Sequence, residues 1–226
     1  MPIGTFVNVA TVVAGSMVGL LLRQRFPAAI KTIIFQSVGL ATLVLGMQMA
    51  LENDNFLVLI FSLLIGGILG ELLKLDVRLD GLATALKHML RVGDARFTEG
   101  LITAFLLFCV GSMTIVGALN EGLSADRTLL LTKSILDGFT SIALASVYGV
   151  GVLFSALPLL LLQGGITLLA GQFQGFFSAE IINGLTAVGG VLILGIGLSL
   201  LEIKPIKTIN LLPGLIIVVL LTMFAV

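Results

Sequence analysis

The sequence contains few charged residues, a single cysteine, a single histidine and no tryptophan. Charged residues make up 11% of its 226 positions, whereas soluble chains average about 25%. Because the surface of a soluble fold needs polar side chains throughout, this scarcity excludes a soluble globular protein. The lone Cys109 cannot form an internal disulfide, and one cysteine with one histidine is too few for the usual zinc sites.

The charges that are present balance, with twelve basic and twelve acidic residues. A nucleic-acid-binding protein needs a basic patch to neutralise phosphates, so we expect no nucleic-acid partner. The sequence also lacks a phosphate-binding Gly-x4-Gly-Lys-Ser/Thr loop, a cluster of acidic or histidine metal ligands, and a Ser–His pair within its apolar segments. We therefore expect no cofactor, no metal site and no enzymatic activity.

Hydrophobic residues dominate the chain: they make up 58% of it, and the mean hydropathy is +1.21. A helix that crosses the hydrocarbon core of a bilayer, about 30 Å thick, needs roughly 20 apolar residues. This criterion predicts an all-α, polytopic membrane helix bundle of about eight transmembrane helices, forming a single transmembrane domain over residues 1–226. The predicted spans are residues 3–22, 33–51, 56–73, 98–119, 128–147, 150–171, 180–201 and 207–225.

The boundary between the fifth and sixth spans is the weakest, because residues 128–171 carry no charge after Asp137. A turn at residues 148–151 would give two spans, whereas a kink at Pro158 would give one long span followed by a re-entrant piece. This stretch of 44 residues is twice the length of one crossing, which favours two spans.

Charge placement tests the count independently. With eight spans, ten basic residues fall on one side of the membrane, Arg127 alone falls on the other, and Lys133 lies inside a span. The ten are Arg23, Arg25, Lys31, Lys74, Arg78, Lys87, Arg91, Arg96, Lys204 and Lys207. The positive-inside rule places their side in the cytoplasm and both termini outside. No basic residue precedes the first apolar run, so we expect an uncleaved first helix and not a secretory signal.

The longest connection, residues 74–97, has apolar residues near helical spacing and basic residues on the opposite face. This pattern predicts an amphipathic helix over residues 76–92. The helix either lies in the cytoplasmic interface, with its basic face toward anionic membrane lipids, or packs on the ends of its own bundle.

Two short patterns occur twice, once in the first and fourth spans and once in the third and sixth. They are Gly-x10-Gly-Ser-Met, at residues 4–17 and 100–113, and Leu-Leu-x-Gly-Gly-Ile, at residues 63–68 and 161–166. Similar offsets indicate the duplication of a three-span unit, and because three is odd the second copy would be inverted. Inverted 3+3 repeats recur in secondary transporters, with the binding site near the midplane. The alternative is a chance match in a chain rich in Gly and Leu.

The fifth span carries two ionisable residues, Lys133 and Asp137, at a depth where an ionised side chain costs about 2.5–3.5 kcal/mol. They are four residues apart and therefore share one helix face. A polar stripe at this depth faces another helix or a water-filled cavity, because lipid offers it no partner. The stripe also includes Ser134, Thr140 and Ser141.

Two interpretations of this pair remain open. In the functional one, Asp137 binds a cation or carries a proton, and Lys133 is its counter-charge or an anion contact; in the structural one, the two side chains only neutralise each other. Five amides of other spans would complete a polar cavity or form interhelical hydrogen bonds: Asn8, Gln36, Gln48, Gln163 and Asn183. The small residues suited to close helix packing are Gly15, Gly19, Gly66, Gly70 and Gly111.

Three stretches of the sequence are distinctive: GTFVNVATVVAGSMVGLLL at residues 4–22, LFCVGSMTIVGALNEGL at residues 107–123, and LLTKSILDGFTSIALASVYGVGVLFSALPLLLLQGGITLLA at residues 130–170. They resemble an uncharacterised prokaryotic membrane family, domain of unknown function 554, over the whole length of the chain. The resemblance implies a bacterial or archaeal plasma-membrane protein, and it supplies neither a substrate nor a site.

These observations favour a secondary transporter or channel for a small ion or polar solute, assembled as a homo-oligomer. Asp137 would bind the coupling ion, Lys133 would tune it, and the amides would contact the solute. The alternative is a non-transporting scaffold or sensor, in which the pair serves packing and the 76–92 helix docks a partner. An intramembrane enzyme is the least favoured, because no catalytic set is visible.

Overall fold

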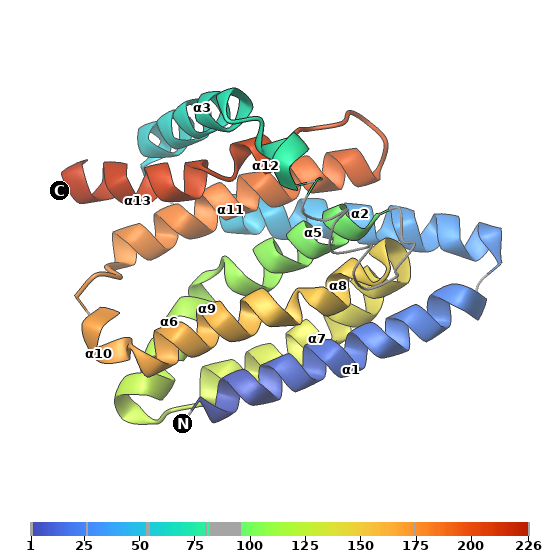
Figure 1. Ribbon diagram of the computed structural model, residues 1–226, viewed down its shortest axis with the longest axis horizontal. Helices are drawn as coiled ribbons and strands as arrows, with labels where there is room; N and C mark the ends of the chain where they lie inside the picture. The colour runs from blue at the N-terminus through green and yellow to red at the C-terminus, as the bar shows by residue number, and fades with distance from the viewer. Residues whose placement is uncertain are drawn as a thin grey trace. The chain divides into compact units, whose positions relative to one another are not determined.

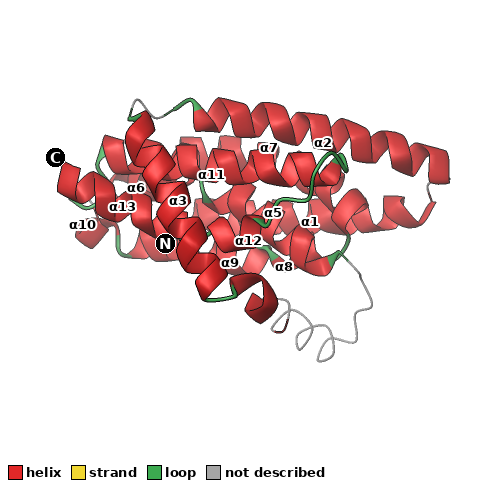
Figure 2. Ribbon diagram, turned by 90° about the horizontal axis from the view of Figure 1, so that it is seen from above, coloured by secondary structure: helices red, strands yellow, loops and turns green. Residues whose placement is uncertain are grey.

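The computed structural model of the chain describes residues 2–25, 27–52, 55–79, 81, 96–173 and 175–225. Within these residues every regular element is an α-helix (Figure 2). The helices form two compact units. The first unit comprises Met1–Ile34 and Asp94–Ser178, and the second comprises Phe35–Gly93 and Ala179–Val226.

The first unit holds most of the polar residues singled out above. Its helices are α1 (Ile3–Arg25), α5 (Phe97–Cys109), α6 (Ser112–Ser124), α7 (Thr128–Tyr148), α8 (Gly151–Phe154), α9 (Ala156–Leu168) and α10 (Ala170–Phe173), as labelled in Figure 1. The second unit holds α3 (Phe56–Leu72), α11 (Ala179–Leu200), α12 (Thr208–Leu211), α13 (Gly214–Ala225) and most of α2 (Ala28–Ala50).

The chain turns between α7 and α8, as the favoured two-span interpretation of residues 128–171 requires. Gly149 ends α7 with a φ of 80°, a left-handed conformation that glycine adopts without steric cost. Pro158 does not kink a long helix, because it lies in the first turn of α9, where its missing N–H is not needed. The segments Thr128–Tyr148 and Gly151–Leu168 are each long and apolar enough to cross a membrane alone.

The predicted span 98–119 is not one continuous helix. The structure breaks it into α5 and α6, which meet at a bend of 54°. Gly111 is extended at the break, with φ −171° and ψ 152°. The Thr114 hydroxyl donates to the carbonyl oxygen of Phe108 at 2.9 Å and so satisfies an acceptor near the end of α5. Hydropathy does not detect such a break, because the residues on either side of it are equally apolar.

Helices α1 and α7 pack closely and run parallel (Figure 1). A Cβ atom at Gly15 would clash with the Ser141 side chain and the Gly138 carbonyl group, and one at Gly19 would clash with the Ile142 carbonyl group. A step of four residues along α1, from Gly15 to Gly19, moves the contact four residues along α7, from Gly138 to Ile142, so the two helices run in the same direction. Small residues allow this approach of two backbones, as in other membrane helix pairs.

The second unit packs its helices in antiparallel pairs. A Cβ atom at Gly66 of α3 would meet Gly214, and one at Gly70 would meet Asn210, so residue numbers rise along one helix as they fall along the other. Helices α2 and α11 cross where a Cβ at Gly46 would lie 2.8 Å from the Gly190 carbonyl oxygen. Between α12 and α13, residues 212–213 interrupt the predicted span 207–225.

Five helices of the described chain are long and apolar enough to span a membrane, and the bent pair α5–α6 is a sixth if it forms one span. The apolar segments Phe56–Leu72 and Thr208–Phe224 are shorter. A count of eight spans therefore stays a prediction, and so does the inverted repeat. Its two Gly-Ser-Met copies differ locally, since residues 15–17 lie inside α1, whereas residue 111 lies at the break and residues 112–113 begin α6.

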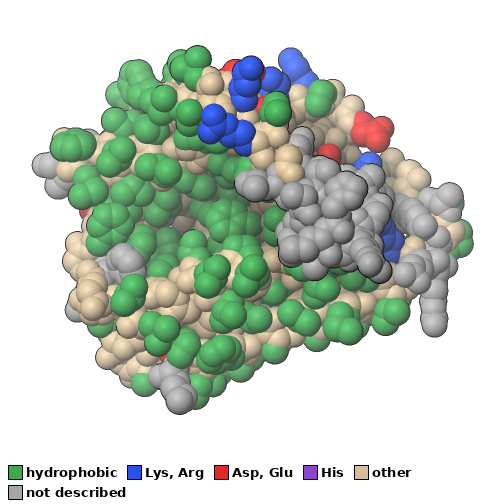
Figure 3. Space-filling model, in the orientation of Figure 1, with side chains coloured by type: hydrophobic (Ala, Val, Ile, Leu, Met, Phe, Trp, Pro, Cys, Tyr) green, Lys and Arg blue, Asp and Glu red, His purple; other side chains and the backbone are tan. Residues whose placement is uncertain are grey.

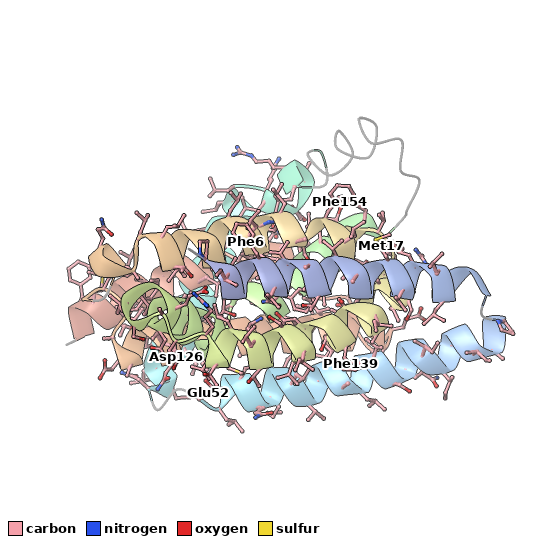
Figure 4. All side chains as sticks on the ribbon, turned by 90° about the horizontal axis from the view of Figure 1, so that it is seen from below. Phe6, Met17, Glu52, Asp126, Phe139 and Phe154 are labelled. Carbon is pink, nitrogen blue, oxygen red and sulfur yellow. The ribbon has the colours of Figure 1, made fainter. Side chains whose placement is uncertain are left out.

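The surface of the described residues is rich in large apolar side chains, and Figure 3 shows them over much of the face on view. Phe139 on α7, labelled in Figure 4, is 71% exposed, and Phe224 on α13 is 86% exposed. Helices in lipid need such a surface, whereas water penalises it. Of the predicted amphipathic helix 76–92, residues 76–79 and 81 are helical, and residues 80 and 82–95 lie outside the described residues.

Candidate functional site

The site predicted from the sequence centres on Lys133 and Asp137, and both side chains lie in the interior of the first unit. They are 6% and 9% exposed, respectively. The Lys133 ammonium group donates to Asp137 Oδ2 across one turn of α7. The two residues are therefore an ion pair removed from solvent, in which each charge offsets the cost of burying the other.

Asp137 has a second partner on α1. Asn8 Nδ2 donates to Asp137 Oδ2 at 3.0 Å, and also to Gln163 Oε1 on α9 at 3.1 Å. Gln163 Nε2 in turn donates to the Thr5 hydroxyl at 3.1 Å. Asn8, Gln163 and Thr5 are fully buried. The structure thus joins three helices through one hydrogen-bonded chain, which includes two of the predicted amides and adds Thr5.

Helical periodicity brings the remaining predicted residues of α7 close to the pair without making them part of the chain. Ser134 donates to the Leu130 carbonyl oxygen at 2.6 Å, and Ser141 donates to the Gly138 carbonyl oxygen at 2.7 Å. Both hydroxyls are thus satisfied by their own helix. Thr140 is half-buried.

The ion pair lies beside the break between α5 and α6. Lys133 Nζ is 5.8 Å from the centroid of the Phe108 ring, a distance at which a cation is attracted to an aromatic face. The carbonyl group of the same phenylalanine receives the Thr114 hydroxyl across the break. An interrupted helix next to a buried charge is the arrangement that many transporter sites use.

Several buried oxygens of the first unit have no hydrogen-bond partner among the described residues. They include Asn8 Oδ1, Ser16 Oγ and Glu121 Oε2. Each described buried side-chain atom that lacks a partner lies in this unit. Buried polar groups are normally satisfied, so such oxygens indicate places where a water molecule or an ion belongs.

Gln36 lies on α2 in the second unit, and its side chain is exposed. The glycines predicted for packing also divide: Gly15, Gly19, Gly66 and Gly70 lie at close helix contacts, whereas a Cβ at Gly111 would meet nothing within 4 Å. Gly111 marks the start of α6 instead.

Sequence reasoning missed Glu121. It lies one turn before the end of α6, and the predicted span ended at residue 119, so the sequence placed it in a polar connection. Its side chain is only 1% exposed. Oε1 accepts the backbone N–H of Gly4 at 2.7 Å and lies 3.2 Å from Nε of Arg127. Because the neighbouring residues are polar, no signal in the sequence identifies this acid as buried.

The second unit treats its buried polar groups differently. Within the described residues none of them is ionisable. Thr42, Ser62 and Thr186 donate to the carbonyl oxygen four residues earlier on their own helices, at 2.7, 2.6 and 2.8 Å. Such hydroxyl groups need no bound water molecule or ion to satisfy them. The buried charges Glu121, Lys133 and Asp137 all belong to the first unit.

Comparison with known proteins agrees with this architecture of apolar helices. The chain matches, over residues 3–223, the family described as "Protein of unknown function (DUF554)". It belongs to this family. The resemblance of the three distinctive stretches is thereby confirmed over nearly the whole length.

Two relatives are similar over nearly their whole length. "Uncharacterized membrane protein YdfK" of Bacillus subtilis (strain 168) is 40% identical over 218 residues, which cover 95% of this chain and 93% of the relative. "Uncharacterized protein YqgA" of Escherichia coli (strain K12) is 30% identical over 222 residues, or 96% of this chain and 94% of the relative. No solved structure matches the chain. As a DUF554 protein with several long apolar helices, the chain is a membrane protein.

Proposed function

We propose that this DUF554 protein is a secondary transporter or channel for a small ion or polar solute, with its site at the Lys133–Asp137 pair. One observation carries the proposal: a buried ion pair, hydrogen-bonded to the Asn8 amide of α1 and through it to Gln163 of α9, lies beside a break in a membrane helix. Ionised residues at this depth are costly and are usually retained for transport. A pair that served only packing would need neither the break nor a buried oxygen without a partner.

Helix directions support the eight-span topology. Helices α1 and α7 run parallel, as expected for the first and fifth spans, whereas α2 runs antiparallel to α11 and α3 to α13. If the chain crossed only once between residues 128 and 171, α11 would run parallel to α2. We therefore propose eight crossings of a bacterial or archaeal plasma membrane, with both termini outside by the positive-inside rule.

The proposal is tested with a double variant that keeps the site neutral. Lys133→Met with Asp137→Asn removes both charges, so the variant avoids the unpaired buried charge that would destabilise either single variant. We expect the wild type in proteoliposomes to carry an ion above the protein-free rate, and the double variant to lose at least about 90% of that flux. Fluxes are measured with ²²Na⁺, ⁸⁶Rb⁺ and ³⁶Cl⁻, and for protons with an entrapped pH-sensitive dye.

The control is Glu99→Gln, which removes an exposed charge of the same unit and should carry the ion at the wild-type rate. Thermal unfolding in detergent establishes that each variant is folded. A folded double variant with wild-type flux would assign the pair to packing alone. A wild type that carries none of these ions would remove the ion-transport proposal itself.

A further inference from the structure

Glu121 is a buried acid that the proposed site does not use. Its Oε1 atom receives two contacts, one from the Gly4 N–H at 2.7 Å and one from Arg127 Nε at 3.2 Å. Its Oε2 atom is buried and has no partner among the described residues. Only half of the carboxylate is therefore satisfied, which is unusual for a group this costly to bury.

Glu121 lies between the surface and the inner ion pair. Arg127, which holds it, is 37% exposed at the start of α7. Gly4, which also holds it, is one helical turn from Asn8, or about 6 Å along α1. Asn8 donates to Asp137. The two buried acids thus contact successive turns of one helix.

The two acids share one arrangement. In each, a basic residue and a donor of α1 contact the same carboxylate oxygen: Arg127 and Gly4 at Glu121, and Lys133 and Asn8 at Asp137. The buried atoms without a hydrogen-bond partner at these two places are Glu121 Oε2, Asn8 Oδ1 and Arg127 Nε, of which Arg127 Nε lies in the ion pair with Glu121 Oε1. A carboxylate or amide oxygen only accepts hydrogen bonds, and it is a ligand for hard cations.

We propose, relying on the transport function above, that the species carried or coupled is a small monovalent cation and that Glu121 is its outer binding residue. Arg127 occupies the carboxylate when the cation is absent, as Lys133 occupies Asp137. The cation carries a single charge, because a cation that displaces one basic side chain from the carboxylate must replace its single positive charge. The buried site then stays neutral.

The other charged groups on the elements around Glu121 have partners of their own or lie away from it. Helix α7 contributes Lys133, which contacts Asp137, and α9 and α10 carry no charged residue. The charged residues of α1 and α5 lie at the opposite ends of those helices. In the loop between α6 and α7, the backbone and side chain of Thr128 donate to Asp126 and lower the pKa of that carboxyl group. Arg127 is thus the charged partner of Glu121.

The test measures binding and does not require flux. Arg127→Gln, Glu121→Gln and the double variant are purified in detergent, and Tm is compared in sodium, potassium and choline chloride at equal ionic strength. Because Arg127→Gln lacks the basic side chain that neutralises Glu121, its stability should depend most on the cation. Sodium or potassium should raise its Tm by about 5 °C over choline, the shift expected at a cation concentration well above Kd. Glu121→Gln and the double variant should lose most of this difference, and Glu99→Gln should keep the wild-type response.

A second series of Tm measurements distinguishes a proton from an alkali cation. If the guest is a proton, lowering the pH in choline should raise the Tm of Arg127→Gln relative to that of the double variant, and sodium should add nothing. If Arg127→Gln responds neither to alkali cations nor to pH, or if the double variant responds equally, Glu121 binds no cation. That result would leave the transport proposal standing, because wild-type flux and the effect of the Asp137 variant are measured separately.

Discussion

At the scale of single residues, the chain stabilises charge in its interior through neighbours four residues apart and through one amide. Asp137 receives the Lys133 ammonium group from its own helix and the Asn8 amide from α1. This arrangement leaves little tolerance for change, because removal of either charge leaves the other buried and unpaired.

This dependence predicts strongly non-additive stability effects. Lys133→Met or Asp137→Asn alone should each lower the free energy of unfolding by about 3–5 kcal/mol, since each leaves an unpaired buried charge. The double variant should lose much less than the sum of the two. Reversible unfolding in mixed detergent and SDS micelles measures all three. Additive losses would mean that the two side chains do not interact in the folded protein.

Sequence reasoning identified this pair because its signal is local. Two ionisable residues at a spacing of four, inside an apolar stretch, can be read directly from the chain. The partners Asn8 and Gln163 were predicted as polar residues within spans, but their contact joins segments 155 residues apart. Glu121 was missed for the opposite reason, since a span-end acid is normally solvated and only the packing of α1 against it removes the water.

At the scale of elements, the close approach of α1 and α7 sets the position of the site. Asn8 reaches Asp137 because Gly15 and Gly19 let the two backbones approach further along the pair. The break between α5 and α6 has a different cause. There Gly111 adopts an extended backbone that other residues also adopt, so its lack of a side chain is not what the packing requires.

Alanine substitutions at the two positions should therefore differ. Gly15→Ala adds a methyl group against the Gly138 backbone, which cannot move away, and should cost about 1–3 kcal/mol of unfolding free energy. Gly111→Ala should change it by less than about 0.5 kcal/mol, because its Cβ would meet nothing within 4 Å. Unfolding in mixed micelles compares the two. An equal loss at Gly111 would show that the glycine has a packing role after all.

The elements themselves were predictable to different degrees. Hydropathy located the long helices within a few residues, because a run of about 20 apolar residues leaves a bilayer helix few alternatives. It did not locate the break in the predicted span 98–119 or the interruption near Pro213. Both depend on backbone conformation within stretches that are apolar throughout, and average hydropathy carries no information about φ and ψ.

At the scale of the whole molecule, the two units divide the polar chemistry between them. The second unit satisfies Thr42, Ser62 and Thr186 within their own helices, so those hydroxyls are complete without a guest. The first unit contains all three buried acidic or basic side chains of the described chain and the buried oxygens without partners. Function should therefore respond to small polar changes in the first unit and not to similar changes in the second.

Ser16 and Thr186 provide a matched comparison of this kind. Both are fully or almost fully buried, but the Ser16 hydroxyl has no partner, whereas Thr186 donates to the Ile182 carbonyl oxygen. Ser16→Ala breaks no hydrogen bond and should leave the Tm within about 2 °C of wild type, yet lower the ion flux at least about threefold. Thr186→Val should keep the wild-type flux.

Proteoliposome flux of the ion that the wild type carries, measured beside Tm, separates the two quantities. Removal of a hydroxyl that serves only packing should change Tm. Removal of a hydroxyl that contacts water or an ion in transit should change the flux. If Ser16→Ala carried the ion at the wild-type rate, the unsatisfied oxygens of the first unit would not line the path, and the division of chemistry between the units would concern stability alone.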